Sequence, residues 1–360
     1  MQQERVLLGM SGGVDSTAAC KILQSQGYEV VGLTLLTCER SIPACEEAAA
    51  LAARFGIEHH IADIRDEFHG SVITPFLQAY LSGLTPNPCI DCNPTIKFRV
   101  LMEHADRLGC SHIATGHYVR TLREGGKYFI RQGADAKKDQ SYFLWRLSQE
   151  QIARTLFPLG EMTKEEARTL LKEEGLTEKA NDGESMEICF FDGDYRDYLR
   201  SAIPDADNTI RPGHFVDSEG RKLGEHKGFP YYTIGQRKGL NIALGYPAYV
   251  LRINAAKNTV MLGEADKLLT LYMIVESPVW VNGIPSEEMS VRIRHRSTPA
   301  PCRIVRELPD GRWLVRFDKP VSAVTPGQSA VFYTGDTVAG GAYISSQRGI
   351  NQWINENEQQ

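Results

Sequence analysis

The chain has 360 residues, of which 42% are hydrophobic and 24% charged, proportions typical of a soluble globular protein with two or three domains. No uninterrupted apolar run approaches the ~18 residues that a membrane span needs, and Met1–Leu8 has no basic flank or cleavable apolar stretch, so we expect a cytoplasmic protein without a membrane partner. The formal net charge of −5 disfavours bulk electrostatic binding of nucleic acid, so any RNA contact must be local.

The first informative segment is an apolar strand, Arg5–Leu8, that runs directly into a glycine-rich turn. Gly12 and Gly13 have no Cβ, so they can adopt backbone angles that aim consecutive N–H groups at an anion. A helix expected from about Ser16 to Gln26 adds the positive end of its dipole. No Gly-Lys-Ser/Thr sequence closes the turn, so it is not a Walker loop. We predict a different phosphate-binding loop, formed by Gly9, Met10, Ser11, Gly12, Gly13, Val14, Asp15 and Ser16.

Helices and strands alternate after this turn. We expect strands at 28–36 and 58–64 with a helix at 46–55 between them, which favours a doubly wound parallel sheet in an α/β domain. In such sheets ligands bind at the carboxyl ends of the strands, where the glycine-rich turn falls. Residues 111–118 repeat the pattern of a strand followed by a glycine. We expect Leu35 and Gly116 to flank the adenine of a bound nucleotide, in a first domain spanning residues 1–202.

The pattern changes in the second half of the chain. Thr163 and Glu166 have the spacing of a capping box, so we expect a helix with a structural role from there to Gly175. After residue 202, short β-like segments alternate with glycine turns and predict a small β-rich central domain over 203–277. These segments are 213–216, 231–233 and 248–251. From 278 to 360 we predict a C-terminal β-barrel, with a hairpin turn at Asp310-Gly311.

Eight cysteines in a cytosolic chain indicate free thiols or metal ligands more than a disulfide framework. Cys89 and Cys92 lie among prolines in segment 84–98, so we expect a stiff loop that holds both thiols in place for chemistry. Zinc is disfavoured because no second cysteine or histidine pair has ligand spacing. Cys189 is the third candidate. The others stand in apolar contexts and are expected to be small buried hydrophobic residues: Cys20, Cys38, Cys45, Cys110 and Cys302.

Several segments resemble known families. The turn SGGVDS resembles the signature of the PP-loop ATP pyrophosphatases, which split ATP between its α and β phosphates and adenylate an oxygen of the substrate. The later segments TPNPC..CN..IKF, ATGHY, KKDQSYFL, ESMEICF, GEHKGFPYYTIGQRKGL and PGQSAVFYTGD have the order found in the tRNA-specific 2-thiouridylases. Those enzymes replace the 2-oxo group of the wobble uridine of tRNA with sulfur. The resemblance covers residues 9 to about 341 and implies a HUP-like PP-loop domain followed by β-rich domains.

The resemblance also implies cofactors, partners and residue roles. ATP would bind with Mg²⁺, and the tRNA would be a lysine, glutamate or glutamine isoacceptor. Cys189 would receive sulfane sulfur as a persulfide from a donor such as a cysteine desulfurase or a relay protein, and Cys92 would be the nucleophile. The residues implied to lie beside the target base are Asn87, Pro88 and Cys89. Those implied to contact the tRNA elsewhere are Lys138, Asp139, Gln140, Arg294 and His295.

Other functions stay open at this point. Cys89 occupies a position where many members of this family have aspartate, and the set Cys89, Cys92 and Cys189 also resembles the iron–sulfur-dependent tRNA thiolases. An adenylating amidotransferase or synthetase acting on a small molecule would need neither the Cys92–Cys189 pair nor the YYTIGQRKGL segment. The intact SGGVDS turn and the paired cysteines argue against a non-catalytic RNA-binding module.

Overall fold

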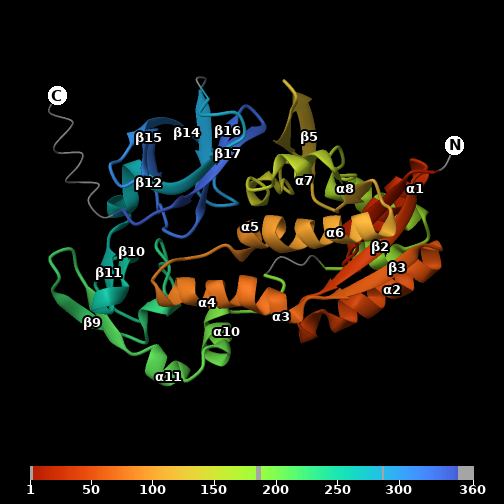
Figure 1. The fold of residues 1–360 in the computed structure, drawn as a ribbon. Coiled ribbons are helices and arrows are strands. Elements are labelled where there is room, and N and C mark those ends of the chain that lie inside the picture. Colours follow the sequence, from red (N-terminus) through yellow and green to blue (C-terminus); the bar gives the residue numbers. More distant parts are fainter. Residues whose placement is uncertain (1–2, 184–187, 286–287, 348–360) are drawn as a thin grey trace. The chain divides into compact units, whose positions relative to one another are not determined.

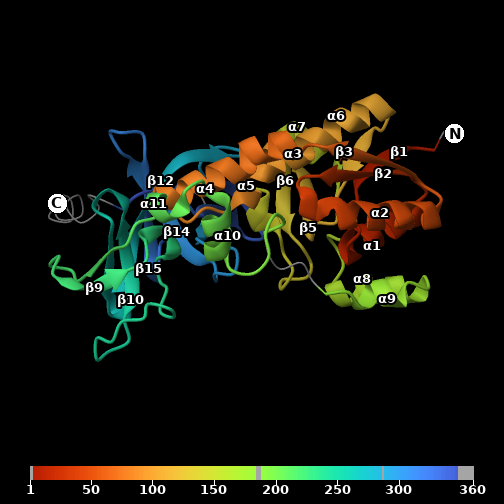
Figure 2. The same ribbon diagram turned by 90° about the horizontal axis from the view of Figure 1, so that it is seen from below.

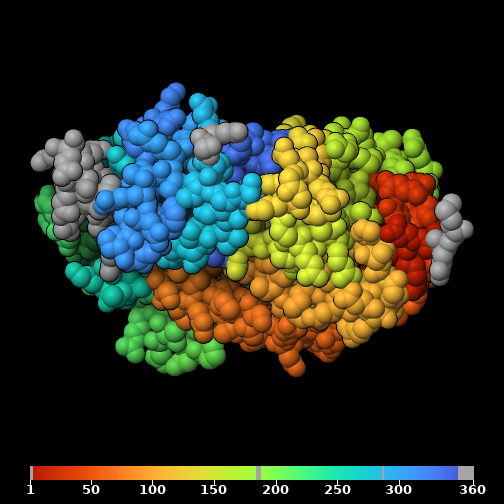
Figure 3. Space-filling model, turned by 45° about the horizontal axis from the view of Figure 1, so that its top comes forward, coloured from red at the N-terminus to blue at the C-terminus, as the bar shows by residue number. Residues whose placement is uncertain are grey.

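The computed structural model describes residues 3–183, 188–285 and 288–347, and the remaining residues are drawn in grey (Figure 3). Four residues of the ESMEICF motif, 184–187, and residues 286–287 and 348–360 of the predicted barrel domain therefore lie outside the described residues. In the described ranges the chain forms two compact units. Unit 1 contains residues 3–73, 88–183, 188–192 and 336–338, and unit 2 contains residues 74–87, 193–285, 288–335 and 339–347. None of the helices in these ranges is long and apolar enough to cross a membrane.

Unit 1 is built on a five-stranded sheet with strand order β3-β2-β1-β4-β7. Figure 1 shows its strands β2 and β3 side by side. All its pairings are parallel, and Val6, Leu7 and Leu8 of the central strand are completely buried. Such continuous apolar runs are typical of strands covered on both faces. The predicted doubly wound α/β sheet is therefore confirmed. Its strands are β1 (Arg5–Gly9), β2 (Glu29–Leu36), β3 (Glu58–Asp63), β4 (His112–Ala114) and β7 (Thr155–Leu156).

Helices cover both faces of this sheet. Figure 2 shows α1 (Val14–Ser25) and α2 (Ile42–Phe55) on one face and α6 (Phe98–Leu108) on the other. The small residues Ala18, Ala19 and Cys20 of α1 are completely buried, which lets the helix approach the strands closely. Two further helices, α8 (Lys164–Glu173) and α9 (Thr177–Asn181), contribute to the same core as α1.

The chain reverses its direction across the sheet at the crevice between β1 and β4. From β1 it moves outward to β2 and β3, and then it crosses back to β4 and β7 on the other side of β1. Ligands bind at such switch points, outside the carboxyl ends of the strands. Gly116 follows β4 at this edge, and a Cβ on Gly116 would lie 2.9 Å from the carbonyl carbon of Asp15. Only glycine permits this approach, which places the loops after β1 and β4 side by side.

The loop predicted over 84–98 is wrong from Pro88 on, where the chain is helical, whereas residues 84–87 lie outside helices and strands. Residues 88–108 form α5 (Pro88–Cys92), a π-helical turn (Asn93–Lys97) and α6 in direct succession. Proline is compatible with the first turn of a helix, because the N–H that it lacks has no partner there in any case. The π-helical turn widens the helix directly after the second cysteine, and such turns are frequent at functional sites.

A hairpin of unit 1 takes a partner from near the end of the chain. The hairpin consists of β5 (Val119–Glu124) and β6 (Lys127–Gln132). The carboxylate of Asp336 accepts hydrogen bonds from the guanidinium groups of Arg120, at 3.0 Å, and Arg131, at 2.6 Å. These contacts hold Asp336–Val338 to unit 1. The unit also contains the short helices α3 (Arg65–Phe68) and α7 (Gln149–Ala153).

Unit 2 contains a four-stranded central sheet with strand order β10-β11-β8-β9. One face is buried through Phe215, Val250 and Val260. The predicted strand at 231–233 is wrong, because Pro230 and Gly228, with φ of 138°, instead favour a short 3₁₀ helix at Phe229–Tyr231. The strands are β8 (Gly213–Val216), β9 (Lys222–His226), β10 (Tyr249–Asn254) and β11 (Thr259–Gly263), and the helices of this unit are α4 (Thr74–Leu81), α10 (Tyr195–Ala202) and α11 (Ala206–Thr209).

Six antiparallel strands close into a barrel through the pairing of β12 with β17. The side chains of Phe317 and Phe332 are completely buried in its interior. The predicted hairpin at Asp310-Gly311 is confirmed, with Gly311 at φ of 79° between β14 and β15. The barrel strands are β12 (Leu269–Trp280), β13 (Met289–Arg292), β14 (Ala300–Glu307), β15 (Trp313–Ser322), β16 (Ser329–Thr334) and β17 (Thr337–Ile344).

Candidate functional site

The glycine-rich turn joins the end of β1 to the start of α1, as predicted. Gly12 has φ of 73°, and a Cβ on it would lie 3.1 Å from the carbonyl oxygen of Ala44. The Ser16 hydroxyl donates to the Gly13 carbonyl at 3.1 Å and accepts from the Ser11 N–H at 3.2 Å. The turn is therefore held in one conformation. Its position before the first turn of α1 gives it the positive electrostatics that anions favour.

The carboxylate of Asp15 accepts hydrogen bonds from two residues that are distant in sequence. The Tyr118 hydroxyl donates to Asp15 Oδ1 at 2.7 Å, and Lys164 Nζ donates to the same oxygen at 2.6 Å. The Lys164 side chain is only 10% exposed, and its ammonium lies 5.9 Å from the centre of the Tyr118 ring. A largely buried cation therefore stands at the glycine-rich turn, although the turn itself contains no lysine.

Sequence reasoning misses Lys164. It predicts the capping box of this helix correctly, with Thr163 accepting from the backbone N–H of Glu166, but it gives the helix only a structural role. No local spacing can connect Lys164 with Asp15, because 149 positions separate them. One signal is present, since a lysine at the first helical position is opposed by the helix dipole. A cation in that position indicates a carboxylate or another anion nearby.

The two residues predicted to flank an adenine come from the neighbours of β1 on either side. Leu35 lies near the carboxyl end of β2 and is half-buried. The register pairs Gly9 with Leu33, so Leu35 extends two residues beyond the end of β1. Gly116 lies against the first turn of α1, where its ideal Cβ would be 3.0 Å from the Ser16 nitrogen. The fold thus brings both residues to the edge of the glycine-rich turn.

The three candidate thiols all belong to unit 1. Cys89 and Cys92 lie on α5, and Cys189 lies in a turn near the end of the unit. Two contacts fix the segment that carries Cys189: the ring of Phe190 packs 5.9 Å from that of Phe68, and Asp192 forms an ion pair with Arg40. All three cysteines are free thiols, with Cys189 the most exposed.

The thiols influence one another electrostatically. Burial raises the pKa of Cys89, and it raises the pKa of Cys92 to about 12. Desolvation by the surrounding protein also raises the pKa of Cys189 to about 11, although this residue is exposed. Negative charge on Cys89 or Cys189 further raises the pKa of Cys92, and Cys89 acts on Cys189 in the same way. Such effects inside a protein require proximity, so folding makes these thiols neighbours. Cys38 also raises the pKa of Cys189, so this half-buried residue is near the site and is not the buried hydrophobic residue that we expected.

Lys97 opposes the effect of burial on these thiols. Its positive charge lowers the pKa of Cys89, Cys92 and Cys189, and its backbone also acts to lower the pKa of Cys92. Lys97 ends the π-helical turn that begins just after Cys92, so the lysine lies within one widened helical turn of this cysteine. No carboxylate pairs with Lys97 among the described side chains. Lys97 is part of the motif IKF, but the sequence alone does not indicate a role for it.

The same part of unit 1 contains a carboxylate and a histidine. Asp91, one position before Cys92, forms an ion pair with Arg146. This pairing ties the only carboxylate of α5 to a neighbouring segment. Burial, together with the charge of Lys97, lowers the pKa of His117 well below its usual range, so this histidine is neutral at neutral pH. Its Nδ1 lies 2.8 Å from the Thr115 hydroxyl.

The arrangement of the three thiols shows whether they could serve together as metal ligands. Over the ranges that the structure describes, no group of three or more His, Cys, Asp or Glu residues surrounds a common point as metal ligands would. Cys89, Cys92 and Cys189 are neighbours, but in this arrangement they do not fit an iron–sulfur cluster.

The segment 138–140, implied to contact tRNA, is part of the support of the site. Asp139 is 3% exposed, and its carboxylate accepts from the backbone N–H groups of Gly133 and Ser141 at 3.2 and 3.1 Å. The Gln140 side chain accepts from the backbone N–H of Tyr118 at 3.0 Å. Lys138 is half-exposed. Asp139 and Gln140 thus hold the loop that carries Tyr118, the partner of Asp15.

The remaining candidates are divided between the units. Pro88 and Cys89 begin α5 in unit 1, whereas Asn87, Arg294 and His295 belong to unit 2. The Arg294 guanidinium donates to the Ile234 carbonyl at 2.8 Å and to the Thr325 hydroxyl at 2.5 Å. These bonds hold Arg294 in a half-buried position between two loops of unit 2, and His295 is also half-buried. The glycine-rich turn and the three thiols thus belong to unit 1, whereas Asn87, Arg294 and His295 belong to unit 2.

Three family models match successive parts of the chain. A model described as a tRNA methyl transferase HUP domain matches residues 4–193. A tRNA methyl transferase PRC-barrel domain matches residues 197–264, and an aminomethyltransferase β-barrel domain matches residues 271–344. The domain boundaries that we place at residues 202 and 277 from the sequence stay predictions.

Curated relatives match over nearly the whole chain. The tRNA-specific 2-thiouridylase MnmA 3 of Phocaeicola vulgatus is 54% identical over 370 residues, covering 99% of this chain and 98% of the relative. MnmA 3 of Bacteroides fragilis is 55% identical over 359 residues, with the same coverage. A solved 4-thiouridine synthetase with RNA and bound ATP is 17% identical, covers 57% of this chain and 52% of its own, and has a TM-score of 0.35, which is too low to carry an argument. The two curated relatives show that this chain belongs to the family of tRNA-specific 2-thiouridylases.

Proposed function

We propose that this protein activates the O2 atom of the wobble uridine of tRNA with ATP and then replaces this oxygen with sulfur. The proposal rests on the observation that unit 1 contains both the glycine-rich turn, at the switch point of its sheet, and a group of neighbouring thiols. The loop alone would also suit adenylation of a small molecule, and the thiols alone would suit redox chemistry. Together they suit ATP-dependent sulfur transfer, and the thiolation activity of the curated relatives supports the same reading.

The glycine-rich loop would hold the phosphates of ATP. Backbone N–H groups, the amino end of α1 and the ammonium of Lys164 all favour negative charge there. Uridine O2 would attack the α-phosphorus, pyrophosphate would leave, and O2 would become part of a good leaving group, AMP. Mg²⁺ bound with ATP would neutralise phosphate charge, and the carboxylate of Asp15 would be a suitable ligand for this ion. Leu35 and Gly116 would flank the adenine.

Sulfur transfer would use two of the three thiols, Cys92 and Cys189. The terminal sulfur of a Cys189 persulfide would attack C2 of the activated uridine and expel AMP. The Cys92 thiolate would then attack Cys189 Sγ, which breaks the S–S bond and leaves 2-thiouridine and a Cys92–Cys189 disulfide. A cellular dithiol would reduce this disulfide. The persulfide would come from a cysteine desulfurase or a relay protein in the cytoplasm, where thiols stay reduced.

The tRNA would be a lysine, glutamate or glutamine isoacceptor whose wobble base leaves its stack to reach the thiols. Asn87, Pro88 and Cys89 would lie beside this base, and Lys138, Arg294 and His295 would contact the RNA. Because Asp139 is buried and Gln140 holds the Tyr118 backbone, we assign these two residues to positioning of the loop.

The first prediction concerns Lys164. The variant Lys164→Ala removes the largely buried cation at the glycine-rich loop, so AMP formation with tRNA and ATP should fall by about 10²-fold, a typical cost for losing one charge-stabilising group. Calorimetric ATP binding and AMP production would be measured together. The matched control is Lys21→Ala, because Lys21 pairs with Glu174 at 2.8 Å between the same two helices and does not contact the loop. Equal loss of AMP formation in both variants would contradict the role.

The second prediction separates the roles of Cys92 and Cys189. Cys189→Ser should take up no sulfane sulfur from a persulfide donor, whereas Cys92→Ser should be charged but should not turn over. Mass spectrometry of the intact protein would measure the charging, and nucleoside analysis of the tRNA would measure 2-thiouridine. The control is Cys38→Ser, which removes a neighbouring thiol with no proposed role and should behave as wild type. If Cys189→Ser and Cys92→Ser are charged equally, the assignment is wrong.

The third prediction concerns pH. Burial raises the pKa of Cys92 and Cys189, and Lys97 opposes this rise, so Lys97→Met should raise both pKa values further. The alkylation profile of these thiols should move to higher pH, and alkylation near neutral pH should slow about tenfold. Lys97→Arg should keep the wild-type profile. Arg99→Gln is the control, because Arg99 pairs with Glu103 at 2.6 Å and does not act on the thiols. An unchanged profile in Lys97→Met would refute the electrostatic role.

The fourth prediction concerns the cysteine that stands where many relatives in this family have aspartate. Without an iron requirement, Cys89→Asp should keep near wild-type thiolation and Cys89→Ser should keep substantial activity. The measurement is iron content after anaerobic purification, compared with thiolation of the same samples. Stoichiometric iron in the wild type that disappears together with activity in Cys89→Asp would establish the cluster-dependent alternative instead.

A further inference from the structure

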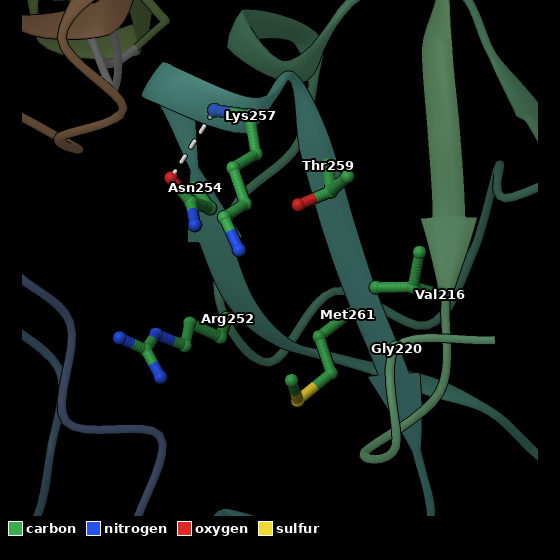
Figure 4. Close-up of a pocket in the computed structure, with 7 residues that line it drawn as sticks. All are labelled: Val216, Gly220, Arg252, Asn254, Lys257, Thr259 and Met261. Carbon is green, nitrogen blue, oxygen red and sulfur yellow. Dashed lines mark hydrogen bonds between the residues drawn. The ribbon is translucent and has the colours of Figure 1, made fainter. Parts of the chain in front are cut away.

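One face of the central sheet in unit 2 carries a pocket of about 500 Å³ (Figure 4). Two rows of cross-strand partners line it: Arg252, Met261 and Val216 form one row, and Asn254 and Thr259 form the other. The rows lie on the face opposite the buried core of the sheet, since the side chains of successive residues in a strand alternate between faces. The pocket therefore combines an apolar floor of methyl and thioether groups with polar side chains.

Arg252 and Lys257 bring two positive charges to this pocket. Figure 4 shows the Lys257 side chain beside those of Asn254 and Thr259, with the Arg252 guanidinium extending on the same side of the sheet. Both cations are exposed. None of the described residues that line the pocket is a carboxylate.

The nearby acidic residues are already paired with other cations. Asp217 accepts a hydrogen bond from Arg221 at 2.6 Å, and Glu225 pairs with Lys222 at 3.0 Å. Within the described part of the chain, Arg252 has no ion-pair partner, and neither has Lys257. The protein thus places two uncompensated cations around one hollow, although its net charge is negative.

The turn that carries Lys257 is held in place. Asn254 Oδ1 accepts from the Lys257 backbone N–H at 3.3 Å, and the next residue, Asn258, has the left-handed conformation with φ of 47°. The Asn258 amide donates to the carbonyl of Pro212 at 2.9 Å, and its own carbonyl accepts from the His214 N–H at 3.2 Å. Little backbone entropy would be lost when this turn meets a ligand.

We propose that this pocket binds the sugar–phosphate backbone of tRNA. Arg252 and Lys257 would contact phosphate oxygens, Asn254 and Thr259 would hydrogen-bond to ribose hydroxyls, and Met261 would lie against the sugar. The inference rests on the proposed function, because it takes tRNA as the substrate. A chain with net charge −5 can hold a polyanion only through local cation groups, and phosphate contacts of this kind position RNA without reading its sequence.

The experiment measures the affinity of the full-length protein for an unmodified tRNA transcript over a series of salt concentrations. In Arg252→Ala/Lys257→Ala, we expect the dissociation constant to rise about tenfold and the slope of log affinity against log salt to become shallower by about 2, as expected for two lost phosphate contacts. The rate of thiolation at saturating tRNA should not change, because the pocket contains no thiol or ATP-loop residue. Arg252→Lys should retain most of the affinity.

The matched control is Arg221→Ala/Lys222→Ala, which removes two cations from the same sheet that already have acidic partners. We expect this control to change the tRNA affinity less than twofold. Equal losses in the two double variants would mean that only overall charge matters, and they would overturn the proposal.

Other outcomes identify a different occupant and also overturn the proposal. An unchanged tRNA affinity with weakened binding of free AMP or pyrophosphate would make the pocket a site for a small phosphate compound. An unchanged tRNA affinity with slower persulfide charging by a donor protein would make it a protein contact. The proposed function fails separately, if wild-type protein forms no 2-thiouridine in the tRNA that it binds.

Discussion

The close approach between the loops that follow β1 and β4 is the constraint on which the candidate site depends. The strand order places these two loops together, and Gly116 lets the second loop contact the first turn of α1. Tyr118, two residues later, can then reach Asp15, and Lys164 completes the same hydrogen-bonded group. Any side chain at position 116 would separate the loops and remove these contacts. One backbone contact thus fixes both the shape and the charge of the glycine-rich turn.

The three neighbouring thiols are subject to a second constraint, which concerns their charge. Desolvation keeps water away from a reactive sulfur, but it also suppresses the thiolate that carries out the chemistry. The protein balances these effects with Lys97, whose charge acts on all three thiols and which has no carboxylate partner among the residues described. The π-helical turn contributes to this arrangement, because it places Lys97 within one widened helical turn of Cys92. Local backbone geometry and thiol reactivity are therefore coupled.

Local signals in the sequence predict much of the fold and part of the site. Alternating helices and strands predict the parallel sheet, and Asp310-Gly311 predicts the barrel hairpin, because both patterns act over a few residues. Local signals mislead at Pro88, which starts a helix, and at Pro230, which lies in a 3₁₀ helix just before the β-like run predicted at 231–233. Lys164 escapes prediction because its role depends on a contact 149 positions away, and the burial of Asp139 depends on loop packing. Spacing rules contain no information about such long-range contacts.

The position of Asp336 in the sequence determines when unit 1 can complete its hydrogen bonds during synthesis. Unit 1 contains the first strand of the chain, yet Arg120 and Arg131 of its hairpin pair with a carboxylate from near the other end. During synthesis on a ribosome, this unit cannot complete these hydrogen bonds until residue 336 has emerged. An N-terminal fragment would expose two arginines and the open edge of a hairpin. A polypeptide that ends before Asp336 would therefore leave this hairpin edge unpaired, and unpaired edges favour aggregation and proteolysis.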